Sequence, residues 1–558
     1  MTNEEFLQQF GHFIDAPNGI QKLREMVLQL AVQGKLVPQD STDEPAILAL
    51  NHATQASDAS SKSGKGKKSK PLQEMTDQDA SYVKPEGWEW ARLGNVVEVL
   101  DNIRKPVKKA DRKPGPYPYY GASGIVDYVS DYLFDEALVL IGEDGAKWGA
   151  GENTAFMISG KTWVNNHAHV LRPNRTIFTD SFLVYSLVAM DLQPFITGMT
   201  VPKLNQARLN SIILPIAPLP EQHRIVAKVD ELMALCDRLE AERNARQATH
   251  QRLIRSVHHP LTEAADTKTT QTAWHRIRDN FADLYTTLES VQALRQTILQ
   301  LAVQGKLVEQ QAGDEPTSEL LIRIEEEKEA LIKKKETKAG KYLLSVEEEN
   351  GLFEIPSSWA WVRLGQLLLD SEAGWSPKAE NTPAYGENWG VLKVSAVSWG
   401  EFKPLENKTL LPTTEPKTQY EVKSGDFLIS RANTAELVAR SVVVDETPPK
   451  LMMSDKIIRL KFSNKIDSCY INLFNSSVFA RDYYAKVAGG TSSSMKNVSR
   501  QQIACLPVAL PPFNEQHRIV TKVDELMTLC DQLEANIRDK KDTAARYAEA
   551  IVQQIAAA

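Results

Sequence analysis

Apolar residues recur with the spacing of a helix in the stretch EQHRIVAKVDELMALCDRLEA at 221–241. Separations of four, three, four and three positions link Ile225, Val229, Leu232, Cys236 and Leu239. This alternation keeps one face of a helix apolar and is typical of the a and d positions of a coiled coil. The same spacing returns at Ile519, Val523, Leu526, Cys530 and Leu533. The pattern predicts long helices at about 219–257 and 513–556, and prolines at 218, 220, 511 and 512 suit the helix starts.

A second type of helix is predicted at about 5–34 and again at about 275–305. Each would end near a glycine, Gly34 or Gly305, as helices commonly do. The apolar face is formed by Leu23, Val27, Leu30 and Ala31, and then by Leu294, Ile298, Leu301 and Ala302. Amphipathic packing in a helical bundle would explain the pattern. A long antiparallel coiled coil joining two globular domains explains it better, because the repeated helices bracket whole domains.

The chain is a tandem duplication. LQLAVQGKLV at 28–37 recurs unchanged at 299–308, and WEWARLG at 88–94 recurs as WAWVRLG at 359–365, both 271 positions later. The helix at 221–241 recurs at 515–535, which is 294 positions later, with 18 of its 21 residues kept. The segment between these motifs is therefore 23 residues longer in the second copy. The repeated parts form a frame, and the unlike inserts within it suggest two different targets.

The ends of the chain complete the duplication. The centre holds both helix types in order, whereas the N-terminus holds one and the C-terminus holds the other. We expect the N-terminal helix to pack beside the C-terminal one, so that the ends reproduce what the centre has in one piece.

The inserts read as mixed α/β. Strand character is present in ALVLIG at 137–142, HAHVLRP at 167–173, FLIS at 427–430 and KIIRLKF at 456–462, and 179–190 reads as a short helix. The predicted fold is therefore α+β: two mixed α/β domains joined by a long antiparallel coiled coil with pseudo-two-fold symmetry. The expected segments are an N-terminal helix and basic linker (1–84), a first insert domain (85–215), a central coiled-coil region (216–310), a charged helical linker (311–355), a second insert domain (356–510) and a C-terminal helix (511–558).

Composition describes an ordinary globular protein, with 42% hydrophobic and 25% charged residues among 558. No apolar run is long enough for a membrane span and the N-terminus lacks the features of a signal peptide, so we expect a cytoplasmic protein. The four cysteines show no metal-binding spacing and are expected to be free thiols. A net charge of −7 does not indicate nucleic-acid binding, although such binding depends on local patches. Two basic stretches, 60–70 and 333–341, are either solvated linkers or phosphate contacts.

No catalytic motif is found. The chain has no phosphate-binding loop of the Walker type, no nucleophile elbow, no H-E-x-x-H zinc motif and no tetrapeptide of an amino-methyltransferase. His223 and His517 recur with the frame at helix starts, where capping or interface packing is a better interpretation than catalysis. We expect no active site and no metal site.

The doubled PLPEQHRIVAKVDELM and PPFNEQHRIVTKVDELM, the doubled LQLAVQGKLV and the divergent inserts resemble the specificity subunit of type I restriction–modification enzymes. Within the inserts, 118–134 with 140–149, and 426–444 with 451–460, resemble the target-recognition domains of that family. Family members often carry glycine at the position of Ala439. The resemblance covers essentially the whole chain.

The resemblance implies a non-catalytic subunit that binds double-stranded DNA at a split, asymmetric sequence. Each insert domain would read one half, and the paired helices would set the distance between the halves. Two modification subunits would dock on the frame and methylate adenine, and restriction subunits would join the complex. S-adenosylmethionine, ATP and Mg would then belong to the partner subunits, with no cofactor in this chain. The frame residues expected at the docking surfaces are Gln222, His223, Arg224, Gln516, His517 and Arg518.

Base edges in the major groove are read mainly by Arg, Lys, Asn, Gln and small hydroxyl side chains. The candidates in the first insert are Tyr119, Tyr120, Ser123, Lys147, Asn165, Asn166, Thr200, Lys203 and Asn205. The candidates in the second insert are Trp375, Lys378, Lys393, Arg431, Asn433, Lys456, Thr491, Ser493, Lys496 and Asn497. For each residue, phosphate contact or ordinary loop structure is an alternative.

Two other functional classes compete with this interpretation. A coiled-coil scaffold without a role on DNA would not require its inserts to differ beside a preserved frame. A stand-alone DNA methyltransferase would need cofactor motifs that the sequence does not contain.

Overall fold

A computed structural model describes residues 13–14, 16–62, 82–263, 267–334, 352–398, 400–492 and 495–557. The chain forms two compact units, one of residues 1–248 with 538–558 and one of residues 249–537. The helices α7 (Leu219–Glu263) and α16 (Phe513–Ala557) each run from one unit into the other. None of the described helices is long and apolar enough to cross a membrane.

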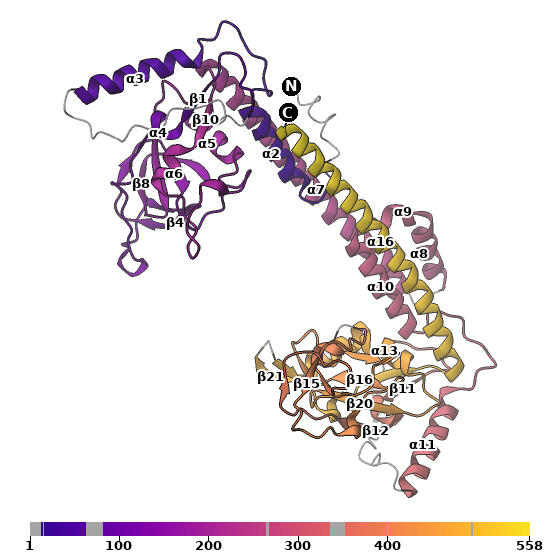
Figure 1. Ribbon diagram of the computed structural model, residues 1–558. Coiled ribbons are helices and arrows are strands. Elements are labelled where there is room, and N and C mark those ends of the chain that lie inside the picture. Colours follow the sequence, from indigo (N-terminus) through magenta and orange to yellow (C-terminus); the bar gives the residue numbers. More distant parts are fainter. Residues whose placement is uncertain are drawn as a thin grey trace. The chain divides into compact units, whose positions relative to one another are not determined.

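The first unit places a two-sheet domain beside frame helices (Figure 1). Its elements besides α7 and α16 are α2 (Gly19–Val32), α3 (Ala46–Lys62), β1 (Glu89–Arg92), α4 (Leu93–Val96), β2 (Val97–Val99), η3 (Lys109–Asp111), β3 (Tyr117–Gly121), β4 (Gly124–Val129), β5 (Phe134–Asp135), β6 (Leu138–Gly142), β7 (Ala155–Ile158), β8 (Lys161–Val164), β9 (Ala168–Pro173), α5 (Asp180–Ala189), η4 (Gln193–Phe195), α6 (Gln206–Ser211) and β10 (Ile213–Ile216). Strands β1 and β10 pair antiparallel and mark where the insert leaves and rejoins the frame.

In the central sheet of the first insert domain, in the order β2-β9-β6-β7, the strand β6 is buried on both faces. Leu138 and Leu140 of β6 pack toward the second sheet, β4-β3-β8-β5, with Phe134 and Val164. Val139 and Ile141 point the other way, into the core that contains helix α5. Alternate residues of a strand face opposite sides, so the uninterrupted apolar run of β6 serves two cores. The predicted strands at 137–142 and 167–173 are thereby confirmed.

The second unit repeats this plan with different strands. Its elements are α8 (Thr267–Asp279), α9 (Phe281–Leu284), α10 (Leu288–Val303), α11 (Thr317–Lys333), β11 (Ala360–Arg363), α12 (Leu364–Leu367), β12 (Leu368–Ala373), β13 (Ala379–Glu380), β14 (Gly390–Leu392), η6 (Val394–Ala396), β15 (Asn407–Leu410), η7 (Thr418–Tyr420), β16 (Phe427–Ser430), β17 (Ala432–Asn433), β18 (Ser441–Val443), β19 (Leu451–Met452), β20 (Ile457–Phe462), α13 (Ser468–Ser476), α14 (Val478–Val487), β21 (Gly489–Ser492), β22 (Met495–Asn497), α15 (Arg500–Ala504) and β23 (Pro507–Leu510). The sheets are ordered β12-β20-β16-β18, β13-β15-β14-β19 and β17-β22-β21. Strands β11 and β23 pair as β1 and β10 do.

The predicted seam of the frame helices is buried. Ile225, Val229, Leu232 and Cys236 of α7 have almost no exposed surface, and so do Ile519, Val523 and Cys530 of α16. In the first unit α7 shares a core with α2 and with Ala548 of α16. In the second unit the C-terminal part of α7 shares a core with α10 and the N-terminal part of α16, beside which α8 and α9 lie (Figure 1). The mixed α/β domains and the coiled coil of the predicted fold are confirmed.

One predicted helix is wrong in its continuity. The stretch 275–305 is divided into the end of α8, the single turn α9 and the long helix α10. Thr287 starts α10 with a capping box, since its hydroxyl accepts from the backbone of Ser290 and the Ser290 hydroxyl accepts from the backbone of Thr287. A cap fixes a helix start and so ends the preceding turn. The corresponding N-terminal prediction, 5–34, lies partly outside the described residues. Within the described part the helix α2 begins only at Gly19, since residues 13–14 and 16–18 do not belong to it.

The two frame glycines have the same structural cause. Gly34 and Gly305 end α2 and α10 with φ of 69° and 71°, a backbone region that favours glycine. A Cβ on Gly34 would lie 2.5 Å from Pro85 Cγ, and one on Gly305 would lie 2.6 Å from Pro356 Cγ. The repeated glycine thus lets each helix end against the proline that precedes the tryptophan motif.

A buried histidine ties α7 to α10 in the second unit. His258 lies between the hydroxyls of Tyr285 at 2.7 Å and Thr297 at 2.9 Å. Burial lowers the pKa of His258 from 6.5 to about 4. Below pH 6.5 the imidazole of His258 is protonated in the unfolded chain, whereas in the folded chain it becomes protonated only near pH 4. The free energy of unfolding therefore decreases as the pH is lowered from 6.5 to about 4.

We expect His258→Gln to remove this pH dependence. The parent should lose about 2 kcal/mol more than the variant between pH 7 and pH 5, at about 1.4 kcal/mol per pH unit. Urea unfolding of both full chains at the two pH values measures the difference. Equal losses in parent and variant would contradict a neutral, buried His258.

Candidate nucleic-acid interface

Four loops of the first insert domain meet at one edge of its central sheet. Strands β2 and β6 end at this edge and β9 begins there, because β9 is antiparallel to both. The loop of residues 197–205 reaches the same edge, where Leu204 N–H donates to the carbonyl of Glu143 at 2.8 Å. The candidates for base contact at 147, 165–166 and 200–205 therefore lie on loops that start from the same edge of the sheet.

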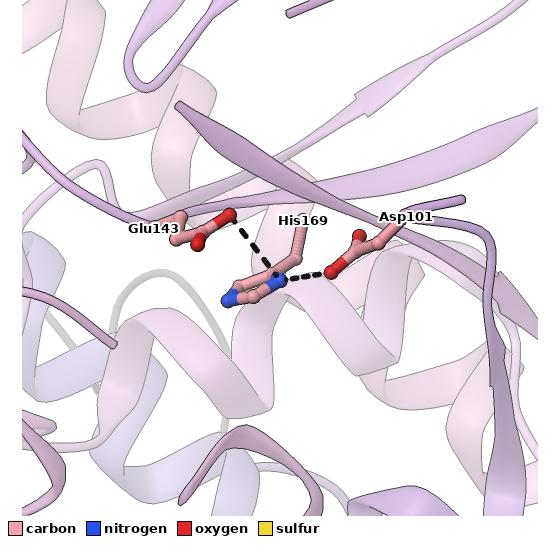
Figure 2. A group of neighbouring side chains, drawn as sticks. All are labelled: Asp101, Glu143 and His169. Carbon is pink, nitrogen blue, oxygen red and sulfur yellow. Dashed lines mark hydrogen bonds and ion pairs between the residues drawn. The ribbon is translucent and has the colours of Figure 1, made fainter. Parts of the chain in front are cut away.

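A charged cluster beneath these loops holds them together. We call Asp101, Arg104, Glu143, His169 and Lys203 the edge cluster. Figure 2 shows the His169 ring between two carboxylates, with Nδ1 2.5 Å from Asp101 Oδ2 and 3.8 Å from Glu143 Oε2. The other ring nitrogen, Nε2, donates to the carbonyl of Leu204 at 2.7 Å. Residues in or next to all four loops thus meet at one buried group, the His169 ring.

The cations of the edge cluster match its acids. Arg104 pairs with Glu143 and lies 3.3 Å from Asp101, and Lys203 Nζ lies 2.6 Å from Glu143 Oε1. Asp101, Glu143 and His169 lie close enough together to ligate a metal ion. Two cations already compensate the two carboxylates, as buried charges require, so the donor set fits a structural ion-pair network better than a metal centre. Sequence reasoning missed this cluster, because its members are scattered over about a hundred residues.

The structure divides the first-domain candidates into surface and interior side chains. Ser123, Lys147, Asn166 and Thr200 are exposed and Tyr120 is partly exposed. Tyr119 and Asn165 have 1% and 5% of their surface exposed, which removes them from the set that can contact DNA directly. Asn165 Oδ1 instead accepts from the backbone of His167 at 2.8 Å.

Two further candidates in this domain are engaged in its own structure. Asn205 caps helix α6, accepting from the backbone of Arg208 at 3.0 Å. Lys203 belongs to the edge cluster and is half-exposed. An N-cap oxygen is already committed to a backbone donor, so Asn205 positions the loop rather than offering a free amide oxygen.

The second insert domain brings its candidates together in a small sheet. Asn433 of β17 pairs with Lys496 of β22, and the neighbouring Ala432 pairs with Asn497. Arg431 N–H donates to the carbonyl of Lys456 at 2.8 Å, which joins the β20 loop to the same surface. Segments some 65 residues apart thus bring Arg431, Asn433, Lys496 and Asn497 into one small sheet and the residue next to it. Ser493 and the side chain of Thr491 lie outside the described residues.

The remaining second-domain candidates border this sheet or lie apart. The backbone N–H of Trp375 donates to the carbonyl of Met453 at 3.0 Å, and the Lys417 ammonium lies 4.4 Å from the centroid of the Trp375 ring. Lys378 and Lys456 are exposed, and Lys456 lies 3.5 Å from Asp455. Lys393 lies 3.9 Å from Glu406 and is partly buried.

The frame residues expected to dock partners have mostly internal roles. Gln222 and Gln516 are fully buried, so neither can be a surface contact. Arg224 pairs with Asp43 at 2.7 Å and Arg518 pairs with Asp314 at 2.5 Å, the same contact in both copies. Of the six expected residues, the two histidines His223 and His517 remain exposed. His517 Nδ1 lies 2.6 Å from Asp467 Oδ2.

Comparisons with known proteins agree on one family. A family model described as the type I restriction modification DNA specificity domain matches residues 85–246 and again residues 356–540. The chain is 34% identical over 565 residues to the type I restriction enzyme EcoEI specificity subunit of Escherichia coli, covering 96% of this chain and 93% of that protein. It is 29% identical over 573 residues to the EcoAI specificity subunit of Escherichia coli, with the same coverage.

A solved structure shows the same fold. One chain of a structure described as the basis of complex assembly and conformational transition of the type I R-M system matches with a TM-score of 0.51 and 17% identity. The match covers 85% of this chain and 99% of that one.

The edge cluster predicts a large effect for a small change. Glu143→Gln would leave Arg104 and Lys203 with one carboxylate fewer, and removing one partner of a buried ion pair costs about 3 kcal/mol. Glu152→Gln is the matched control, because Glu152 faces Lys147 at 3.6 Å with both side chains exposed, and should change stability by less than about 0.5 kcal/mol. Urea unfolding of the two full-chain variants at neutral pH checks this. Equal effects would mean that the edge cluster does not hold the domain together.

Proposed function

Because the chain belongs to the family of type I restriction–modification DNA specificity subunits, we propose that it reads a DNA sequence in two unlike parts, one with each insert domain. The subunit would direct adenine methylation and restriction by partner subunits without catalysing either reaction. The sequence offers no cofactor-binding motif, so S-adenosylmethionine, ATP and Mg would be bound by those partners.

Identical frame contacts beside unlike inserts carry this proposal. Arg24 pairs with Asp237 and Glu240 at 2.7 and 2.8 Å. At the corresponding places of the second copy, Arg295 pairs with Asp531 at 2.6 Å and with Glu534 at 3.1 Å. The inserts that these frames hold differ in their sheets, since the second has a three-stranded sheet, β17-β22-β21, besides its two four-stranded ones. Like frames suit two copies of one partner, and unlike inserts suit two different half-sites.

The candidates that are exposed or partly exposed supply the chemistry of base reading. In the second domain, the partly exposed Arg431 is suited to guanine and the exposed Asn497 to adenine, since these pairings can form two hydrogen bonds each. The Asn433 amide is engaged within the domain, since its Nδ2 donates to Ser398 Oγ at 2.9 Å and its Oδ1 accepts from the backbone of Thr434 at 2.8 Å. In the first domain, Asn166 and Thr200 lie on loops fixed by the edge cluster. Readers on fixed loops lose little freedom on binding, which favours selectivity between bases.

Docking of two modification subunits would use the exposed faces of the frame helices. His223 and His517 are the equivalent exposed residues beside the buried glutamines, one in each unit. The proposed stoichiometry is two modification subunits for one specificity subunit. Its support is the duplication of the frame.

We predict that the two insert domains can be exchanged separately. Replacing residues 95–215 by the corresponding segment of another family member should change one half of the methylated sequence and leave the other half intact. Asn497→Ala, within β22, should disturb only the half that the second domain reads. Mapping of methylated adenines after reconstitution with the modification subunits gives the answer. A graft that altered both halves would show that the domains do not read independently, and no sequence-specific methylation by the parent complex would refute the function itself.

The frame helices would also set the spacing between the half-sites. Helix α7 has 45 residues, or on the order of 68 Å at about 1.5 Å per residue, and passes from one unit into the other. Its seam repeats every seven residues, so an insertion must add whole heptads to keep the apolar face on its partner.

We predict opposite outcomes for two matched insertions, made after Leu239 and after Leu533. Seven residues at each point should keep both half-sites and lengthen the unspecified spacer between them. Two residues should rotate the C-terminal remainder of each helix by about 200°, at about 100° per residue, and abolish methylation. Methylation mapping compares both variants with the parent. An unchanged spacer in the seven-residue variant would contradict the role of the helices in setting distance.

A further inference from the structure

The first insert domain contains a concentration of positive charge that the base-reading candidates do not include. Residues 104–113, RKPVKKADRK, hold six basic side chains and one acidic one in a chain whose net charge is −7. This segment leaves the edge cluster at Arg104 and runs along the β4-β3-β8-β5 sheet to the end of β4. There the carbonyl of Lys113 accepts from the backbone of Ser130 at 2.9 Å.

The backbone of this segment is fixed along its length. Lys105 N–H donates to the carbonyl of Val164 at 3.1 Å, and the Lys105 carbonyl accepts from the indole N–H of Trp163 at 2.7 Å. The Tyr119 hydroxyl accepts from Val107 N–H at 2.9 Å, which gives this buried tyrosine its role. The turn η3 closes the middle of the segment.

Two of the six basic side chains, those of Arg104 and Arg112, are engaged in contacts within the domain. Arg104 is part of the edge cluster, and its guanidinium also donates to the carbonyl of Ala168 at 2.7 Å. Arg112 lies over the Tyr119 ring, 4.3 Å from the centroid, and pairs with Asp127 at 2.9 Å. These contacts satisfy the two arginines internally.

The four lysines are different. Lys105, Lys108, Lys109 and Lys113 are all exposed. Among the residues that the structure describes, none of the four has a carboxylate within ion-pair distance, although Lys109 lies in the electrostatic neighbourhood of Asp127. Several lysines of the second insert domain are instead paired with acids, as Lys450 is with Glu387 and Lys403 with Glu401. Unpaired ammonium groups on a fixed backbone are the arrangement that phosphate contact requires.

We propose that residues 105–113 form a basic ledge that binds the DNA backbone beside the half-site read by the first insert domain. The inference rests on the proposed function and adds to it a separate role for this segment: the ledge binds DNA phosphates independently of the base sequence. After the corresponding strand β12, the second domain reads GWSPKAEN with one lysine, Lys378, and no such ledge. The ledge is therefore a local feature of the first domain that this part of the second domain lacks.

The test compares the salt dependence of DNA binding. The chain is assembled with its modification subunits, and affinity is measured by fluorescence anisotropy over a series of KCl concentrations. One duplex carries the methylated sequence and the other a scrambled one. In the triple variant Lys105→Gln, Lys108→Gln and Lys113→Gln, the slope of log affinity against log salt should fall by about 2.7 on both duplexes, at about 0.9 per phosphate contact. The methylated sequence should stay that of the parent.

Two controls isolate the ledge from charge in general. Lys408, Lys423 and Lys486 are exposed lysines of the second domain, and none has an ion pair within the described part of the chain. Changing these three to Gln removes the same charge and should lower the slope by less than about 1, the effect of a single contact. Changing Lys105, Lys108 and Lys113 to Arg keeps the charge and should restore the slope of the parent.

The outcomes separate the ledge from the function on which it rests. A parental slope in the ledge variant, or an equal loss in the second-domain control, would overturn the ledge while leaving specific methylation intact. Loss of assembly with the modification subunits at an unchanged slope would assign the lysines to a protein contact and would also overturn it. A parent complex that does not distinguish the two duplexes would instead refute the proposed function.

Discussion

A buried glutamine in the first turn of each long frame helix fixes an insert domain to the frame. Gln222 Nε2 donates to the carbonyls of Ile177 and Ala217, and its Oε1 accepts from the backbone of Thr179, the N-cap of α5. Gln516 makes the matching bonds to Pro511 and to the N-cap Asp467 of α13. An unpaired buried amide would cost about 1–3 kcal/mol, so each glutamine admits one orientation of its domain on its helix. The direction in which the edge loops of each domain point depends on this joint.

The frame is alike in the two units, whereas the insert domains that it carries differ. The frame repeats its ion pairs, its glycine helix ends and its strand pairs, β1–β10 and β11–β23, in both units. The insert domains keep a buried sheet but build their edges differently: an ion-pair cluster supports the loops of the first, and a three-stranded sheet supports the second. A stable, duplicated support allows the reading edges to change without altering how partners are engaged. The basic ledge adds a local concentration of positive charge that the corresponding segment of the second domain lacks.

The sequence predicted the frame far better than the sites. A seam at 225–239 is visible because helix periodicity is local, and the run at 137–142 is visible because a strand buried on both faces is wholly apolar. The break before α10 does not follow from the spacing of apolar residues, and Thr287, a residue type favoured at helix starts, is the one local sign of it. The edge cluster could not be predicted, because Asp101 and His169 meet only through the pairing of β2 with β9. Ala439 has φ of 58°, a conformation that favours glycine, and the side chains of Asn475 and Arg481 each donate a hydrogen bond to its carbonyl at 2.9 Å.

We conclude that the two copies of the frame are equivalent, so that the ends of the chain complete the same structure as its centre. In the first unit Lys22 of α2 pairs with Glu549 of α16, the two ends of the chain. A circular permutant tests the claim most directly: the natural ends are joined by a flexible linker, and the chain is opened between Glu263 and Thr267, after α7. Methylation mapping of this permutant, assembled with the modification subunits, should return both half-sites and the spacer of the parent. Loss of either half-site, in a permutant that still assembles, would contradict the equivalence of the two frames.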